Sequence, residues 1–454
     1  MPVAKYNMAT MPLGRRHAWV VFVASLGQVI GTGVATLVGI IIPMLNIVSH
    51  PHLNSELQGV IGAMDLIGIV IGSVVFGKLV DKYGYLLFFR LCPAIVLVAS
   101  LIAFLFPTEC VLIVALFFVG FGIGGEYSLD SNYVSELMPV KWKSLMVGIS
   151  KAASAFGNIF VAGICYILIC HWGKAQDWPE LLWIVAVVAA LMLICRIWFY
   201  QSPKWLEEHG KTAEAQIAAE KFLGPDVELA PPSPEDKAAD KPADNKPSSF
   251  WVGNWKQIIL TGIPWACEGL GVYGIGVFLP ILVMSLGIEK VSPTELPIMH
   301  VASSVLVTFF ISCIILPGFL LGLWLIQRKR NICKIQSWGF WLCAISLVIL
   351  LLASMWGWPK WISLVAFMAF ELFLNMGPHL VTYVLPPKVY PVAIRGFGTG
   401  VAASLGKVGA VLGVFFIPVL LDWGGTDLVL IVSAVVMALG AFVTTVFAKM
   451  LKID

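Results

Sequence analysis

The chain has 454 residues, of which 59% are hydrophobic and only 12% are charged. With a mean hydropathy of +0.91, this composition excludes an ordinary soluble protein. The formal net charge of +3 says little by itself.

Apolar runs long enough to cross a lipid bilayer recur along almost the whole chain. Lipid offers no partners to backbone N–H and C=O groups, so unbroken runs of this length must be helices. We therefore predict an all-α membrane protein with twelve transmembrane helices, at 18–45, 56–80, 86–106, 111–137, 144–170, 179–200, 257–285, 297–327, 334–355, 361–385, 396–420 and 426–449.

The basic residues predict the orientation of these helices. Of the 29 Lys and Arg, 24 lie at the termini, in the loops after even-numbered helices or at the helix ends beside them, and only Lys174, Lys290 and Lys360 lie in the other loops. The positive-inside rule then puts both termini in the cytoplasm. Arg15 and Arg16 lead into a helix too long for a signal peptide. We expect a multi-pass protein of a cell membrane, the bacterial inner membrane.

The first two helices carry few polar residues. Gln28 needs a hydrogen-bond partner if it lies in lipid, whereas the surrounding glycines favour helix packing. Asp65 is either a proton site or a pore-lining group near the external mouth. Asp81, at the end of the second helix, can accept hydrogen bonds from a helix N-terminus or pair with a base across the domain interface.

The fourth helix carries three carboxylates, Glu126, Asp130 and Glu136. Because a carboxylate in hydrocarbon costs several kcal/mol, roughly 2.5–3.5 by insertion scales, it normally faces a cavity or a partner. Glu126 and Asp130 are four residues apart and share one helix face. Glycines before them let another backbone come close. This segment indicates a polar site in the middle of the membrane.

The fifth helix places Lys151, Ser154 and Asn158 on one face. Three polar groups on one stripe of a membrane helix rarely face lipid. Lys151 is near enough to the helix start to snorkel to the cytoplasmic surface instead.

A change of composition divides the chain into three parts. Residues 201–256 combine a short charged helix with a segment rich in Pro, Ala, Asp and Lys, which is typical of a flexible tether. On either side we expect a six-helix bundle, residues 1–200 and residues 257–454. Met138–Ser144 and Tyr390–Gly396 align without gaps, which indicates an internal repeat.

The second half carries polar groups inside three helices. Glu268 lies in the seventh helix, and Lys407 lies about three turns into the eleventh, too deep for easy snorkelling. A buried cation needs a carboxylate partner or an anion. In the tenth helix, four polar residues form a stripe: Glu371, Asn375, His379 and Thr382. The histidine is either a core group with satisfied hydrogen bonds or a proton carrier.

Several motifs resemble those of one superfamily. Gly124-Gly125-Glu126-Tyr127-Ser128-Leu129 resembles the GGDYPLS signature of phosphate:proton symporters, a branch of the major facilitator superfamily. The run from Trp265 to Tyr273 and the run around Lys407 resemble that branch as well. Gln201-Ser202-Pro203-Lys204-Trp205-Leu206 resembles a sugar-porter loop. The resemblance implies two six-helix bundles that alternate access to a central site.

In the phosphate branch, the residues matching these motifs surround the anion. Here Glu126, Tyr127, Trp265, Tyr273 and Lys407 are retained, whereas Ser154, Gly269 and His379 differ, and the acids of the first helix are missing. Smaller side chains leave a larger pocket. We therefore expect proton-coupled symport of a small anionic or polar organic metabolite. The alternatives are an inorganic phosphate:proton symporter and a transport-dead membrane sensor of the same fold.

The expected site has three groups of residues. The substrate-binding group is Tyr127, Ser154, Asn158, Trp265, Tyr273, Asn375, His379 and Lys407. The proton-coupling group is Glu126, Asp130 and Glu268. The group that gates the cytoplasmic side is Asp81, Glu136, Lys143 and Arg395. We expect no enzyme activity, cofactor, metal or nucleic acid, and a monomer in the lipid bilayer with a small-molecule substrate and a proton as its partners.

The hypothesis for coupling links two of these residues. Lys407 anchors the substrate, and an arriving anion competes for the lysine, which frees Glu126 to take up a proton. The alternative is a permanent structural salt bridge between Glu126 and Lys407.

Overall fold

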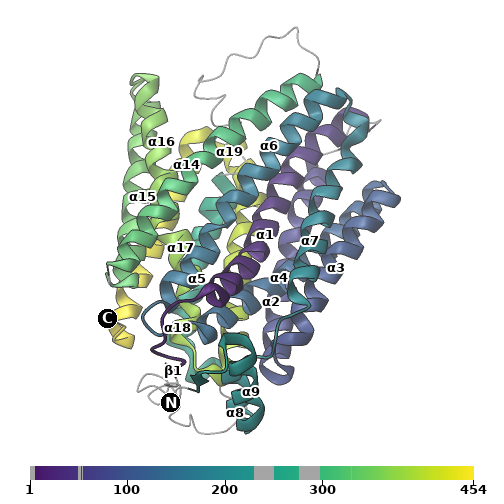
Figure 1. The fold of residues 1–454 in the computed structure, drawn as a ribbon. Coiled ribbons are helices and arrows are strands. Elements are labelled where there is room, and N and C mark those ends of the chain that lie inside the picture. The colour runs from purple at the N-terminus through teal and green to yellow at the C-terminus, as the bar shows by residue number, and fades with distance from the viewer. Residues whose placement is uncertain are drawn as a thin grey trace.

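The fold is described from a computed structural model that covers residues 6–49, 53, 55–229, 250–275, 297–328 and 330–453. Long helices run side by side through the molecule (Figure 1). The first long helix begins and the last one ends toward the same end of the molecule, which we call the terminal face. The expectation that this face is cytoplasmic stays a prediction from the basic residues.

The first half of the chain forms one bundle. Two of its spans are each built from two pieces, α5 with α6 and the 3₁₀ helix η1 with α7. The elements are α1 (Arg15–Val48), α2 (Ser55–Tyr83), α3 (Tyr85–Leu105), α4 (Glu109–Leu137), α5 (Lys143–Ala152), α6 (Ser154–Trp172), η1 (Ala175–Leu181) and α7 (Leu182–Arg196).

The second half forms the other bundle. Its last helix bends sharply at Gly424 and Gly425, where the backbone leaves the helical conformation, so that it supplies two spans. The elements are α11 (Phe250–Gly253), α12 (Trp255–Gly269), the π-helix η3 (Leu270–Ile275), α14 (Pro297–Gln327), α15 (Ile332–Met355), α16 (Lys360–Met376), α17 (Pro378–Val384), α18 (Pro386–Val389) and α19 (Val392–Leu451).

Eleven helical spans among the described residues are long and apolar enough to cross a membrane. They correspond to eleven of the twelve predicted helices. The remaining one, predicted at 257–285, is represented by α12 and η3, and its part from residue 276 lies outside the described residues. Large apolar side chains such as Leu105, Ile167 and Trp338 point outward and are about two-thirds exposed, at 64–66%. They suit contact with lipid rather than water.

Glycines bring α2 and α4 into close contact. A Cβ atom on Gly120 would lie 1.9 Å from the backbone oxygen of Asp65, and one on Gly124 would lie 2.7 Å from that of Ile69. Neither distance is possible for a real side chain. The prediction that the α4 glycines admit a neighbouring backbone is confirmed.

The segment after α7 lies at the terminal face (Figure 1). Instead of one short helix it forms α8 (Pro203–Glu208) and α9 (Thr212–Leu223), separated at Gly210, whose φ of +74° is unfavourable for other residues. The N-terminal strand β1 (Tyr6–Asn7) pairs in parallel with β2 (Val227–Glu228). The predicted tether after β2 falls largely on residues 230–249, outside the described residues.

Candidate functional site

Three irregularities in the helices lie next to expected site residues. The fifth predicted span is interrupted at Ala153, directly before Ser154. The tenth is interrupted at Gly377, directly before Pro378 and His379, because proline cannot donate a backbone hydrogen bond. The seventh becomes a π-helix that contains Tyr273. Such breaks in membrane helices commonly mark ligand sites, because they free backbone groups and re-aim side chains.

Nine buried side chains from both bundles meet near these breaks. We call them the central cluster: Gln28, Tyr127, Lys151, Trp265, Glu268, Tyr273, His379, Tyr383 and Lys407. Its aromatic part is a set of three rings, those of Tyr127, Trp265 and Tyr383, which stand edge-on to one another at centroid distances of 6.1–6.5 Å. The predicted substrate-binding residues of α4, α12, η3, α17 and α19 are therefore brought together.

The two lysines of the central cluster are held by neutral groups. Lys407 donates a hydrogen bond to the Tyr273 hydroxyl, and its Nζ lies 3.9 Å from the Tyr273 ring centroid and 5.1 Å from that of Tyr127. Lys151 Nζ lies 3.5 Å from Gln28 Oε1 and packs against the rings of Tyr127 and Tyr383. Lys151 is 3% exposed, so the snorkelling alternative is wrong. Among the described residues, neither ammonium forms an ion pair with a carboxylate.

A line of polar contacts runs along α16 and α17 to α12. Asn375 donates to the backbone oxygen of Glu371 at 2.8 Å, and His379 Nδ1 lies 2.9 Å from Asn375 Oδ1. On the other side of the ring, His379 Nε2 lies 3.7 Å from Glu268 Oε1. The predicted stripe of the tenth helix thus ends at the carboxylate predicted in the seventh helix.

Two of the expected substrate-binding residues have structural contacts. The backbone oxygen of Ser154 accepts a hydrogen bond of 2.7 Å from Thr32, and the side chain of Asn158 accepts one of 3.0 Å from Thr36. Both contacts join α6 to α1. Ser154 is buried and Asn158 is half-buried, and their roles toward a substrate stay predictions.

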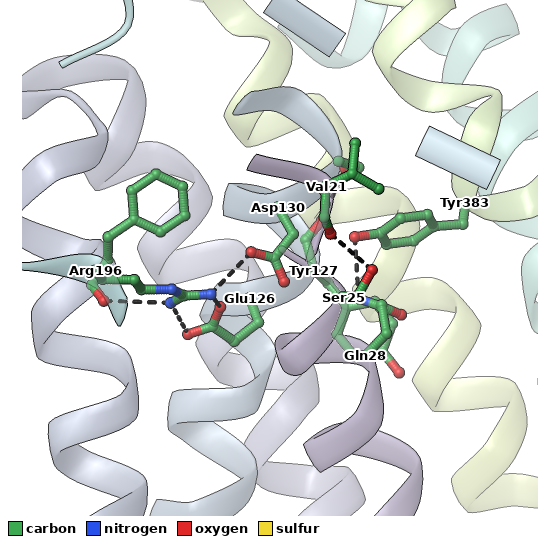
Figure 2. Close-up of polar contacts among 10 residues, drawn as sticks. Val21, Ser25, Gln28, Glu126, Tyr127, Asp130, Arg196 and Tyr383 are labelled. Atoms are coloured by element: carbon green, nitrogen blue, oxygen red, sulfur yellow. Dashed lines mark hydrogen bonds and ion pairs between the residues drawn. The ribbon is translucent and has the colours of Figure 1, made fainter. Parts of the chain in front are cut away.

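Glu126 lies in an ion cluster with Asp130 and Arg196 (Figure 2). Arg196 donates to both oxygens of Glu126, at 2.8 and 2.6 Å, and to Asp130 Oδ1 at 3.0 Å. All three side chains are at most 1% exposed. Glu126 and Lys407 therefore have different partners. The hypothesis that an anion frees Glu126 by competing for Lys407 and the alternative of a salt bridge between these two residues are both wrong.

Arg196 is a site residue that the sequence reasoning did not identify. It lies four residues from the predicted end of its helix, a place typical of the positive charges beside the cytoplasmic helix ends. The structure places its guanidinium against the ring of Phe89, 4.8 Å from the centroid, and facing the two carboxylates of α4. The signal available was the carboxylate pair itself, which requires a buried cation from a neighbouring helix.

Asp130 has one oxygen that remains unpaired. Its Oδ2 is buried and has no hydrogen-bond partner among the described residues. It packs against α1 at Gly27, where a Cβ atom would lie 2.1 Å from Oδ2 and 3.1 Å from Glu126 Oε2. An unpaired carboxylate oxygen buried in this way is costly, unless a proton occupies it.

Asp65 is also buried, at 2% exposure. It is close enough to Lys407 for their charges to interact. Asp65 therefore belongs with the polar interior that surrounds the central cluster.

Three of the four expected gating residues, Asp81, Glu136 and Arg395, join the two bundles near the terminal face, and the gating role of Lys143 stays a prediction. The carboxylate of Asp81 accepts hydrogen bonds of 2.8 and 2.7 Å from the backbone N–H groups of Gly396 and Phe397, in the first turn of α19. Of the two partners expected for Asp81, the helix N-terminus is thus the one observed.

A second link lies beside it. Glu136 at the end of α4 lies 3.5 Å from Arg395 and accepts a hydrogen bond of 2.7 Å from Tyr85. Pro139 and Pro391, which follow Glu136 and precede Arg395, therefore lie toward the same face, as the repeat predicts. Lys143 begins α5 after this turn.

Comparison with known proteins gives a consistent result. The sequence profile of the family "Sugar (and other) transporter" matches residues 15–453. The inner membrane metabolite transport protein YgcS of Escherichia coli is 24% identical over 452 residues, covering 100% of this chain and 96% of its own. The niacin transporter NiaP of Acinetobacter baylyi is 24% identical over 418 residues, covering 89% of this chain and 87% of its own.

A solved structure has the same fold. The proton:xylose symporter XylE, bound to 6-bromo-6-deoxy-D-glucose, superposes with a TM-score of 0.78. The alignment covers 96% of this chain and 95% of XylE, at 18% sequence identity. XylE belongs to the major facilitator superfamily, so the predicted architecture of twelve helices in two bundles is confirmed.

Proposed function

Because this chain belongs to the sugar (and other) transporter family of the major facilitator superfamily, we propose that it is a proton-coupled symporter of a small anionic or polar organic metabolite. Membership makes it a multi-pass membrane transporter of sugars or other metabolites, and not an enzyme. The anionic substrate, the proton and the roles of individual residues are our proposal.

The observation that carries the proposal is the pair of buried lysines in the central cluster. Lys151 and Lys407 come from opposite bundles, are 3% and 4% exposed, and contact hydroxyl, amide and aromatic groups without an ion pair to a carboxylate among the described residues. A buried cation that no carboxylate contacts directly is incompletely compensated, so an arriving anion would be stabilised there. An anion that contacts both lysines would also join the two bundles.

The remainder of the cluster favours an organic anion over phosphate. The rings of Tyr127, Trp265 and Tyr383 offer edges and faces on which a planar or carbon-rich substrate can pack. A niacin transporter among the relatives carries a small aromatic acid by its name, and XylE carries a sugar with a proton by its title. Inorganic phosphate is the second candidate, since two lysines also suit that anion.

The proton has a suitable carrier in the first bundle. Glu126, Asp130 and Arg196 together have a formal charge of −1, and Asp130 Oδ2 is unpaired among the described residues. One added proton would neutralise this cluster without breaking the Arg196–Glu126 pair. We therefore keep Glu126 as the proton-coupling carboxylate, with Asp130 sharing its proton.

The contacts at the terminal face support alternating access. Asp81 and Glu136 bind the start of α19 from the opposite bundle, so these contacts must break when that face opens. We propose that they bias the equilibrium between states open to opposite sides.

The experiment is uptake by proteoliposomes that contain the purified chain. Labelled nicotinate, inorganic phosphate and xylose are offered with and without an inward proton gradient. We expect gradient-driven accumulation of the organic anion. Lys407→Gln should abolish its uptake, whereas Lys211→Gln, which changes an exposed lysine of the α8–α9 loop, should not. Accumulation of phosphate alone would favour the second candidate. Binding without any flux would favour a sensor.

A further inference from the structure

We infer that Glu268 and His379 form a second proton site, in which the two side chains share one proton while Asn375 fixes the histidine tautomer. The inference rests on the proposed function, because it assigns to the central cluster a proton that is taken up together with the anion. It does not involve Glu126, Asp130 or Arg196.

The first step is the orientation of the Asn375 amide. Its Nδ2 lies 2.8 Å from the backbone oxygen of Glu371, which can only accept a hydrogen bond, and 3.4 Å from Glu371 Oε2. The amide nitrogen must therefore point toward Glu371. The amide oxygen is left facing His379, so the usual ambiguity between the two amide orientations is removed.

The second step is the tautomer of His379. Because Asn375 Oδ1 can only accept, His379 Nδ1 must donate across the 2.9 Å that separate them. In a neutral imidazole only one nitrogen carries a hydrogen. His379 Nε2 therefore presents a lone pair to Glu268.

The third step is the contact between the ring and the carboxylate. His379 Nε2 and Glu268 Oε1 lie 3.7 Å apart, and both are acceptors when no further proton is present. Both residues are buried, at 7% and 3% exposure. One proton resolves the conflict, because Nε2–H can then donate to the carboxylate or the carboxylic acid can donate to Nε2.

The fourth step links this proton to the substrate. The charged groups that face the pair are Lys151 from α5 and Lys407 from α19, and Asp65 of α2 interacts with Lys407 in turn. Tyr127, Tyr273 and Tyr383 complete the surroundings. Without an anion, the positive charges of the two lysines oppose a further proton on the pair. An anion that binds both lysines compensates their positive charges. The Glu268–His379 pair can then bind a proton from the side to which the transporter is open.

Asn375 and Glu371 act as positioning residues in this account. They need not contact the substrate, but they decide which nitrogen of His379 faces Glu268. An Asn375→Asp substitution would place a carboxylate against Nδ1–H and favour the doubly protonated ring. The pair should then hold its proton to higher pH than in the unmodified chain.

The deciding experiment needs no substrate. The full chain is reconstituted in lipid and labelled with ¹⁵N in its histidines for NMR. Comparison with His379→Asn assigns the two ring-nitrogen resonances of His379. We expect the Nδ1–H tautomer at alkaline pH. Infrared spectra of the same samples should show a titrating carboxyl band that is lost in Glu268→Gln. The pH midpoint of this band should change in His379→Asn and should rise in Asn375→Asp. The control His209→Asn, which changes an exposed histidine, should leave the band unchanged. An Nε2–H tautomer, or one carboxyl midpoint in all variants, would overturn the inference.

A transport assay separates this inference from the proposed function. In proteoliposomes, Glu268→Gln mimics the protonated carboxyl, so counterflow exchange of nicotinate should persist with a changed dependence on pH, because only the Glu126–Asp130 site still titrates. If the unmodified chain moves no nicotinate, phosphate or xylose, the proposed function fails, and the spectra still decide the proton site. If exchange by Glu268→Gln keeps the pH profile of the unmodified chain, the inference fails and the proposed function stands.

Discussion

At the scale of single residues, the most constrained charges are those around Arg196. A guanidinium that binds both oxygens of one carboxylate and one oxygen of another has nearly fixed geometry. The third group, Asp130, can change its protonation without disturbing that geometry, because its Oδ2 has no partner among the described residues. The cluster can therefore store a proton while remaining folded.

The Glu126→Gln variant tests this role. An amide keeps the shape of the side chain but removes the charge that the proton would neutralise. We expect substrate exchange across the membrane to persist, while accumulation against a gradient is lost. Counterflow and proton-driven uptake in proteoliposomes measure the two activities separately. Full proton-driven accumulation by Glu126→Gln would reject the assignment and direct the test to Asp130 and Glu268.

Removing Arg196 should affect stability instead. Arg196→Met leaves two buried carboxylates close together, and breaking a buried ion pair from one side costs about 3–5 kcal/mol. We expect thermal unfolding in detergent to shift to lower temperature. Adding Glu126→Gln to this variant should restore part of the loss, because one of the two unpaired charges disappears. If the double variant is no more stable than Arg196→Met, the carboxylates do not depend on Arg196.

At the scale of elements, the start of α19 is held by α2 through a helix-terminus contact. The N–H groups of a first helical turn lack partners within the helix, and an aspartate suits both their hydrogens and the helix dipole. Asp81 supplies this partner from the opposite bundle. The contact is specific to a closed terminal face, because it requires α2 and α19 to touch.

We expect Asp81→Asn to slow transport and to leave substrate affinity largely intact. The amide keeps one acceptor and turns an NH₂ group toward a backbone donor, which removes roughly 1.5–3 kcal/mol from the closed state. Flux in proteoliposomes and equilibrium binding measure the two properties, and Asp226→Asn in the loop before β2 is the control. Equal losses of binding and transport would contradict a gating role.

Glycine at the same interface should be equally necessary. A Cβ atom on Gly400 would lie 2.2 Å from the backbone oxygen of Ser73, so Gly400→Ala must push α19 away from α2. Spin labels at Lys82 and Lys449, on a background without native cysteines, should report a longer distance across the terminal face. Gly39→Ala in α1 is a matched control, because no atom lies within 4 Å of its added Cβ. An unchanged distance in Gly400→Ala would show that the interface yields without opening.

At the scale of the whole molecule, the sequence predicts the architecture well. Apolar run length and the requirement for internal hydrogen bonds determine the helices, so eleven predicted spans have counterparts and the bend at Gly424 and Gly425 falls between two predicted helices. The contact of His379 with Asn375 of its own stripe also follows from spacing along one helix.

Pairings between helices are a different matter, because they depend on rotation and depth. A rotation of about 100° per residue decides which neighbour a side chain meets. This is why Glu126 pairs with Arg196 of α7 rather than with Lys407, and why Glu268 faces His379. The breaks at Ala153 and Gly377 add further rotations that no hydropathy pattern reveals.

The pairing of β1 with β2 has a consequence for the order in which the protein is made. β1 is synthesised first, but its partner strand Val227–Glu228 appears only after all of α1–α7. A second contact, from the Val140 N–H to the Ala9 oxygen, also waits for α4 to be complete. The N-terminal segment cannot reach its final position until the first bundle has been synthesised. Once docked, it ties the start of the chain to the segment that follows that bundle, so that a finished first half differs from an unfinished one at the terminal face.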